Sequence, residues 1–111
     1  MTDKRIVLTT TDSEESARKI AQHLVERRLA ACVNLIPQVI SVYRWKNKVE
    51  EAREWLLIIK STKATFALVR DAIAELHSYE VPECVCLKVE DGLPGYLQWI
   101  ADSVSQGKGR D

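Results

Sequence analysis

Residues 29–60 constrain the fold of this chain more than any other stretch. Apolar and polar side chains alternate along residues 32–45 and again along residues 49–59, and a period of two is the signature of a β-strand. Only the polar stretch 46–48 separates the two runs, and it contains Asn47, a residue type favoured in tight turns. The sequence therefore predicts one long β-hairpin here.

The length of this hairpin raises the question of what covers it. Each arm exceeds ten residues, whereas a typical strand has about five or six. A chain of 111 residues can build one core but cannot cover so long a ribbon by itself. Exposed apolar patches mark contact surfaces. We therefore expect another chain to pack against the aromatic side chains of the ribbon, which are Tyr43, Trp45 and Trp55.

The first arm contains Pro37, which lacks the N–H group that a ladder hydrogen bond needs. We therefore expect this arm to be bent or broken near Pro37 and Gln38. Three glutamates lie beside the predicted hairpin tip, with Lys46 and Lys48 of the tip opposite them. They are Glu50, Glu51 and Glu54. These carboxylates either make cross-strand charge pairs on a solvated ribbon or bind a cation, and charge pairing is the favoured interpretation.

The remaining elements follow from local patterns. Residues 4–11 are rich in β-branched side chains and predict a strand, and Asp12 or Ser13 then caps a helix with apolar residues at helical spacing. Ser61 or Thr62 caps a second amphipathic helix that ends near His77. A strand over residues 84–89 and a short final helix complete the chain.

The predicted order is therefore β-α-β-β-α-β followed by a C-terminal helix. This is the split βαβ, ferredoxin-like arrangement of the α+β class. It places two helices on one face of a four-stranded antiparallel sheet that contains the long hairpin. We expect residues 1–104 to form a single domain and residues 105–111 to form a flexible tail, because the tail is small, polar and charged.

Charge argues against several partners. Sixteen basic and sixteen acidic residues cancel and are interspersed, so we expect no nucleic-acid or membrane partner. The first apolar run is too short for a signal peptide or a membrane span, which favours a cytoplasmic protein with reduced cysteines. The sequence has neither a glycine-rich phosphate loop nor a G-x-S-x-G nucleophile motif.

Four residues at three places in the chain could bind a ligand, and each place has a simpler interpretation. Cys84 and Cys86 share a face of the predicted strand; they either fill the core as small apolar residues or bind a soft ion such as Cu(I). Cys32 opens the hairpin and is either structural or a ligand. His77 precedes Tyr79 and two glutamates, and is either a metal or proton site or a histidine favoured by the helix dipole.

Four stretches spread in order over residues 5–104 together resemble the CutA family of divalent-ion tolerance proteins. They read RRLAACVNLIPQVISVYRWKNKVEE, EWLLIIKS, LHSYEVPE and GYLQWI. The resemblance implies a ferredoxin-like fold and a cytoplasmic homotrimer assembled through the long hairpin, similar to the PII signalling proteins. It also implies a role in tolerance of divalent metal ions, with copper bound by some members.

The copper site implied by the resemblance uses a cysteine in the first strand and two histidines at the end of the second helix. Thr9 and Leu76 stand at two of these positions, and only His77 matches. The cysteine of the LAAC motif is present as Cys32, so His77 and Cys32 are the expected metal ligands. The residues expected to line a ligand cleft between subunits are Tyr79, Glu80 and Glu83.

Two functional hypotheses follow. The first is a non-enzymatic trimer that needs no cofactor and binds copper, another divalent ion or a small ligand between subunits. The alternative is a signalling or structural trimer that acts through a protein partner, with metal binding incidental. An enzyme on this fold, as in acylphosphatases, is less favoured because the arginine- and asparagine-containing phosphate loop is absent.

Overall fold

The structure is a computed structural model that describes residues 2–104, so the predicted tail 105–111 lies outside the described residues. The observed order of elements matches the predicted order, with one short 3-10 helix added. The elements are β1 (Lys4–Thr11), α1 (Glu14–Glu26), β2 (Cys32–Trp45), β3 (Lys48–Thr62), η1 (Lys63–Thr65), α2 (Phe66–Leu76), β4 (Val85–Lys88) and α3 (Pro94–Ser103).

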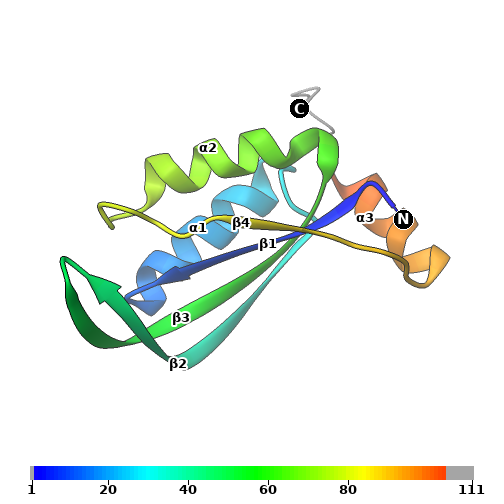
Figure 1. Ribbon diagram of the computed structural model, residues 1–111. Helices are drawn as coiled ribbons and strands as arrows, with labels where there is room; N and C mark the ends of the chain where they lie inside the picture. The colour runs from blue at the N-terminus through cyan, green and yellow to red at the C-terminus, as the bar shows by residue number, and fades with distance from the viewer. Residues whose placement is uncertain (1, 105–111) are drawn as a thin grey trace.

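The four strands form one antiparallel sheet in the order β2-β3-β1-β4, so β2 and β4 are its two edges. Helices α1 and α2 lie side by side over the sheet, and α3 lies at one end of it (Figure 1). This is the predicted α+β, ferredoxin-like arrangement. None of the described helices is long and apolar enough to cross a membrane.

The core lies between the sheet and the two helices. Val7 of β1 pairs with Ile59 of β3, and antiparallel partners share a face of the sheet. Both side chains are fully buried against apolar residues of the helices. The fully buried helix residues of this cluster are Ala17, Ile20, Leu24, Val69 and Ile73.

The opposite face of the sheet, here called the open face, is also apolar. Leu8 pairs with Ile58 and with Val85, so these three side chains share the face that α1 and α2 leave uncovered. Val85 and Leu87 are 44% and 45% exposed. The protomer therefore buries one side of its sheet and leaves apolar side chains accessible on the other.

The hairpin projects beyond the rest of the sheet. The last pair between β1 and β3 is Thr11 with Trp55, so the residues of β3 before Trp55 have only β2 as a partner. Lys46 and Asn47 both adopt positive φ, as a two-residue turn of type I′ requires. Lys48 belongs to β3, so the turn is one residue shorter than the predicted polar tip.

A β-bulge interrupts β2 at the predicted place. Between the pairs Ile36–Leu56 and Val39–Glu54, two residues of β2 stand opposite Trp55 alone. Gln38 adopts a φ of 60°, and the prediction of a bend near Pro37 and Gln38 is confirmed. The bulge in β2 lies opposite Trp55, the residue at which the pairing between β1 and β3 ends. The bend in β2 therefore comes where the sheet narrows to the two strands of the hairpin.

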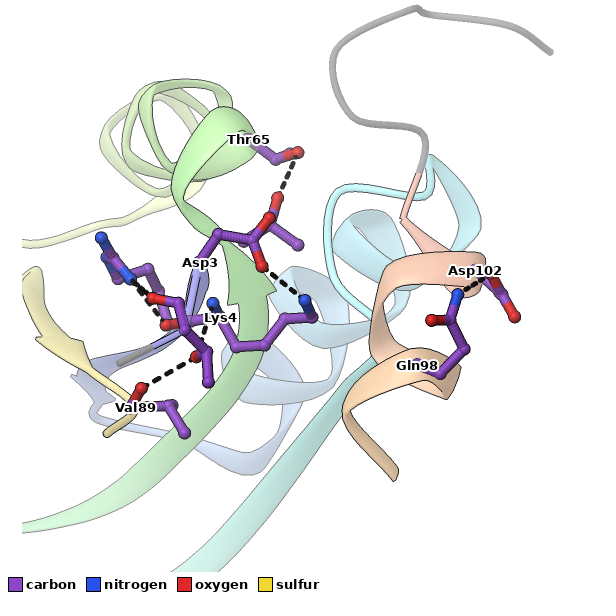
Figure 2. Close-up of polar contacts among 9 residues, drawn as sticks. Asp3, Lys4, Thr65, Val89, Gln98 and Asp102 are labelled. Atoms are coloured by element: carbon purple, nitrogen blue, oxygen red, sulfur yellow. Dashed lines mark hydrogen bonds and ion pairs between the residues drawn. The ribbon is translucent and has the colours of Figure 1, made fainter. Parts of the chain in front are cut away.

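One of the two predicted helix caps is confirmed. Ser13, one of the two candidates for the first helix, caps α1, because its hydroxyl accepts a hydrogen bond from the Ser16 N–H at 3.1 Å. The prediction that Ser61 or Thr62 caps the second helix is wrong, since both residues continue β3 in register with β1. The Thr62 hydroxyl instead donates to the Thr65 hydroxyl at 3.0 Å across η1 (Figure 2).

Backbone and side-chain hydrogen bonds attach the N-terminus to the end of β4. The Thr2 hydroxyl donates to the Val89 carbonyl at 2.8 Å, and the Val89 N–H donates to the Lys4 carbonyl at 3.2 Å (Figure 2). These hydrogen bonds join the beginning of β1 to the residue that follows β4.

Within α3, the Gln98 side-chain amide donates a hydrogen bond to the Asp102 carboxylate, one turn later in the helix, at 2.9 Å.

Candidate functional site

His77 lies at the C-terminal end of α2, where the backbone becomes extended. Its Nδ1 is 3.1 Å from the Tyr79 backbone nitrogen, and its Nε2 is 2.6 Å from the Thr10 carbonyl oxygen. Because an amide N–H can only donate and a carbonyl can only accept, Nδ1 is the acceptor and Nε2 carries the proton. Both ring nitrogens of the neutral imidazole are therefore engaged within the protomer.

Tyr79 connects His77 to the hairpin. Its hydroxyl donates to Glu54 Oε2 at 2.7 Å, and its ring centroid lies 4.6 Å from that of His77. Glu54 is only 8% exposed, so this hydrogen bond satisfies a carboxylate that has little access to water. Burial raises the pKa of Tyr79, and the hydrogen bond and negative charge of Glu54 raise it further. The phenol therefore stays protonated as a donor.

These four residues form what we call the hairpin-root cluster: Thr10, Glu54, His77 and Tyr79. They come from β1, from β3 and from the segment after α2, and they meet where β1 ends and the hairpin begins to project. Asp12 and Tyr43 add smaller contributions to the raised Tyr79 pKa. The cluster can hold the hairpin root in place and can offer imidazole and carboxylate groups to a ligand.

The other residues expected to line a ligand cleft lie outside this cluster. Glu80 and Glu83 are both exposed, and no ion pair within residues 2–104 involves them. Of the three residues predicted for the cleft, the structure brings only Tyr79 into contact with His77.

The two expected metal ligands are far apart in the protomer. Cys32 pairs with Lys60, which is six positions along β3 from Glu54. Six residues of strand span roughly 20 Å, so one chain does not bring Cys32 to the hairpin-root cluster. Within the described part of the chain, no three His, Cys, Asp or Glu side chains are grouped as a metal site requires.

Thr9 and Leu76 stand where the copper pattern implied by the resemblance has ligands, and both lie partly or fully in the protein interior. Leu76 packs against the core. Thr9 is fully buried, and its hydroxyl has no hydrogen-bond partner within residues 2–104. Only His77, of the three positions, takes part in a polar network.

The aromatic residues expected at an interface divide into two groups. Tyr43 and Trp45 lie on the projecting part of the hairpin and are 44% and 38% exposed. Trp55 packs against the core cluster, and its place in the register puts it on the opposite face from Tyr43. The exposed pair therefore fits a contact surface better than Trp55 does.

The predicted charge pairing near the turn is wrong. The register places Glu50 opposite Tyr43 and Glu51 opposite Val42, and the ion pairs of the described chain do not involve the hairpin. Glu54 was considered only with this charged group, and its contact with Tyr79 was not predicted. A signal for its burial was present, because Glu54 alternates in step with the apolar residues Leu56 and Ile58.

Comparison with known proteins gives a consistent result over the whole described domain. The family model of the CutA1 divalent ion tolerance protein matches residues 5–103. The divalent-cation tolerance protein CutA of Thermus thermophilus is 45% identical over 100 residues, which cover 90% of this chain and 97% of the relative. The human protein CutA is 47% identical over 91 residues, and the match spans 51% of its length.

Solved structures agree with this relationship. The structure of the divalent cation tolerance protein from Thermus thermophilus superimposes with a TM-score of 0.90 at 44% sequence identity. The superposition covers 92% of this chain and 99% of that protein. The fold and the sequence therefore point to the same family.

Proposed function

The chain belongs to the CutA1 divalent ion tolerance family, and from this premise we propose that it contributes to divalent metal tolerance as a non-enzymatic homotrimer. The observation that carries this proposal is the uncovered apolar surface of the protomer. This surface comprises the exposed apolar residues of the open face and the hairpin, which are Ile36, Ile40, Val42, Tyr43, Trp45, Val49, Val85 and Leu87.

The edges of the sheet support assembly as a ring. Strands β2 and β4 each present an unpaired edge, and an exposed strand edge is a template for pairing with another chain. Because the two edges differ, contact between β2 of one copy and β4 of the next is heterologous, and such contacts can close into a ring. Three copies close the ring in the assembly that we propose.

The ligand proposed for this assembly is copper, another divalent ion or a small molecule bound near the hairpin-root cluster. An ion that binds His77 must first displace either the Thr10 carbonyl or the Tyr79 N–H from the imidazole. This competition predicts weak binding. Cys32 can contribute only from a neighbouring copy, because it lies far from His77 within one chain.

Titration calorimetry with Cu(II) and Zn(II) tests the metal proposal on the reduced full-length chain. We expect saturable binding that His77→Ala abolishes and that His23→Ala, a change on the surface of α1, leaves intact. Saturable binding that persists unchanged in His77→Ala would overturn the assignment of His77.

The engagement of both His77 nitrogens favours a second candidate. In this alternative the cluster is structural, and the trimer acts through a protein partner with metal binding incidental. Affinity capture with the chelator-treated trimer separates the two proposals. A specific partner that is retained without metal, together with no calorimetric signal for Cu(II) or Zn(II), would favour the alternative.

A further inference from the structure

Cys86 lies in β4, an edge strand of the sheet, and Cys84 comes directly before that strand. Cys86 pairs with Val7, and Cys84 packs against the core cluster to which Val7 belongs. Cys86 is exposed and Cys84 is half-buried. The interpretation of both residues as small apolar core residues is therefore wrong for Cys86, because its side chain is exposed.

The pKa of the Cys84 thiol depends on its burial and on the charges around it. Burial raises the pKa of the Cys84 thiol, and repulsion from Cys86 raises it further, while Arg70 of α2 lowers it. Two neighbouring thiolates repel each other unless a cation lies between them. A bound metal ion supplies that charge and deprotonates the thiols that coordinate it.

The spacing suits a bridging ion better than a disulfide. Residues two apart on a strand have Cα atoms roughly 6.6 Å apart, which is near the upper limit for a disulfide and beyond its usual spacing of about 5.5–6 Å. A linear sulfur–metal–sulfur unit with bonds of about 2.3 Å separates its sulfurs by roughly 4.6 Å. Two cysteine side chains on one face can reach that separation by rotation about their Cα–Cβ bonds.

We propose that Cys84 and Cys86 form a two-thiolate site for a soft, closed-shell metal ion of the Cu(I) class. Thiolate ligands select such ions over harder divalent ions, and binding releases the two thiol protons to solvent. The site shares no residue with the hairpin-root cluster and goes beyond the proposed function. It also lies on the opposite face of the sheet from Val85 and Leu87 of the proposed assembly surface.

Competition with a chromophoric Cu(I) chelator under anaerobic conditions tests the site on the reduced full-length protein. We expect one Cu(I) per chain and an ultraviolet thiolate-to-metal charge-transfer band. Loss of even an outer-shell partner costs about ten- to a hundredfold in metal affinity. Cys86→Ser should therefore weaken Cu(I) binding at least about a hundredfold, and Cys84→Ser should do the same.

Cys32→Ser is the matched control, because Cys32 is the third cysteine and lies at the other edge of the sheet. It should bind Cu(I) as the unmodified protein does. Cys86→Ser changes an exposed side chain, so the variant should fold and its circular dichroism spectrum should match that of the unmodified protein. The test therefore stands even if the half-buried change Cys84→Ser prevents folding.

Equal Cu(I) affinity in the unmodified protein and Cys86→Ser would overturn the proposal, as would an equal loss in Cys32→Ser. His77→Ala distinguishes this site from the divalent site proposed above. It should leave Cu(I) binding by the cysteine pair intact while it removes the calorimetric signal for Cu(II) and Zn(II). The two proposals can therefore fail independently.

Discussion

The body of the sheet and the projecting part of the hairpin share two strands but differ in what covers them. In the body, Leu57 and Ile59 of β3 are fully buried beneath α1 and α2. Beyond the end of β1, Val42 and Val49 of the same hairpin are 66% and 67% exposed. Alternation of apolar residues therefore predicts strands in both regions, but burial depends on a second layer that one chain supplies only to the body.

The elongated shape of the protomer reflects the same difference. Its radius of gyration is 14.5 Å, whereas a compact chain of this length has roughly 13 Å. The bulge at Pro37 and Gln38 and the hydrogen bond from Tyr79 to Glu54 both lie at the boundary between the two regions. The hairpin therefore leaves the body at a defined and braced position.

The largest expected effect tests the packing of the body. Ile73 is fully buried in the core, so Ile73→Ala should lower the free energy of unfolding by about 2–5 kcal/mol in a denaturant titration. Ile40 is 57% exposed on the hairpin, so Ile40→Ala in a dilute, dissociated sample should change it by less than about 0.5 kcal/mol. Equal losses in the two variants would contradict the contrast between the regions.

The second prediction concerns the hydrogen bond from Tyr79 to Glu54, which braces the hairpin where it leaves the body of the sheet. Tyr79→Phe removes the donor to the buried Glu54 carboxylate and should lower the free energy of unfolding by about 1.5–3 kcal/mol. Tyr43→Phe, a change on an exposed part of the hairpin, should have no such effect. If chemical denaturation shows the same stability for Tyr79→Phe and the unmodified chain, the brace does not contribute as described.

The third prediction concerns the buried hydroxyl of Thr9 in β1. The Thr9 hydroxyl is buried without a hydrogen-bond partner in the described chain, and such a group costs about 1–3 kcal/mol. Thr9→Val keeps the shape and removes the hydroxyl, so it should raise the free energy of unfolding by about 1 kcal/mol. Thr2→Val is the contrast, because the Thr2 hydroxyl has a partner in Val89 and its removal should lower stability. A loss of stability in Thr9→Val would show that the hydroxyl is satisfied.

The smallest effect is a dependence on alkaline pH. The Tyr79 pKa is raised in the folded protein, first by burial and then by Glu54, whereas an unfolded tyrosine has a pKa of about 10. As the pH rises above about 10, the unfolded chain releases this proton and the folded chain retains it, so the free energy of unfolding falls. Tyr79→Phe should show a shallower fall in titrations between neutral and alkaline pH. Identical slopes would argue against the shifted pKa.

Much of the fold could be predicted because its signals are local. The alternation of residues 32–45 and 49–59 predicted both long strands, and Pro37 predicted the bend, because a proline cannot complete the ladder whatever surrounds it. The caps of the second helix could not be predicted in this way. Ser61 and Thr62 are good cap residues, but pairing with β1 keeps them in the strand.

The site depended on contacts that no local pattern contains. Glu54 and Tyr79 are 25 positions apart and meet only because the segment after α2 passes the end of β1. Which aromatic residues are available for an interface depends on strand register, because the register places Tyr43 and Trp55 on opposite faces of the hairpin. His77 was identified from the sequence, but its hydrogen bonds to Thr10 and Tyr79 required the structure.

The most direct test of the central claim is the mass of the protein in solution. If the open face and the hairpin are covered by other copies of the chain, sedimentation equilibrium at micromolar concentration should give three times the 12.6 kDa of one chain. Val42→Glu, which places a charge on the exposed hairpin, should shift this distribution toward single chains. A mass of 12.6 kDa for the unmodified protein at those concentrations would contradict the account.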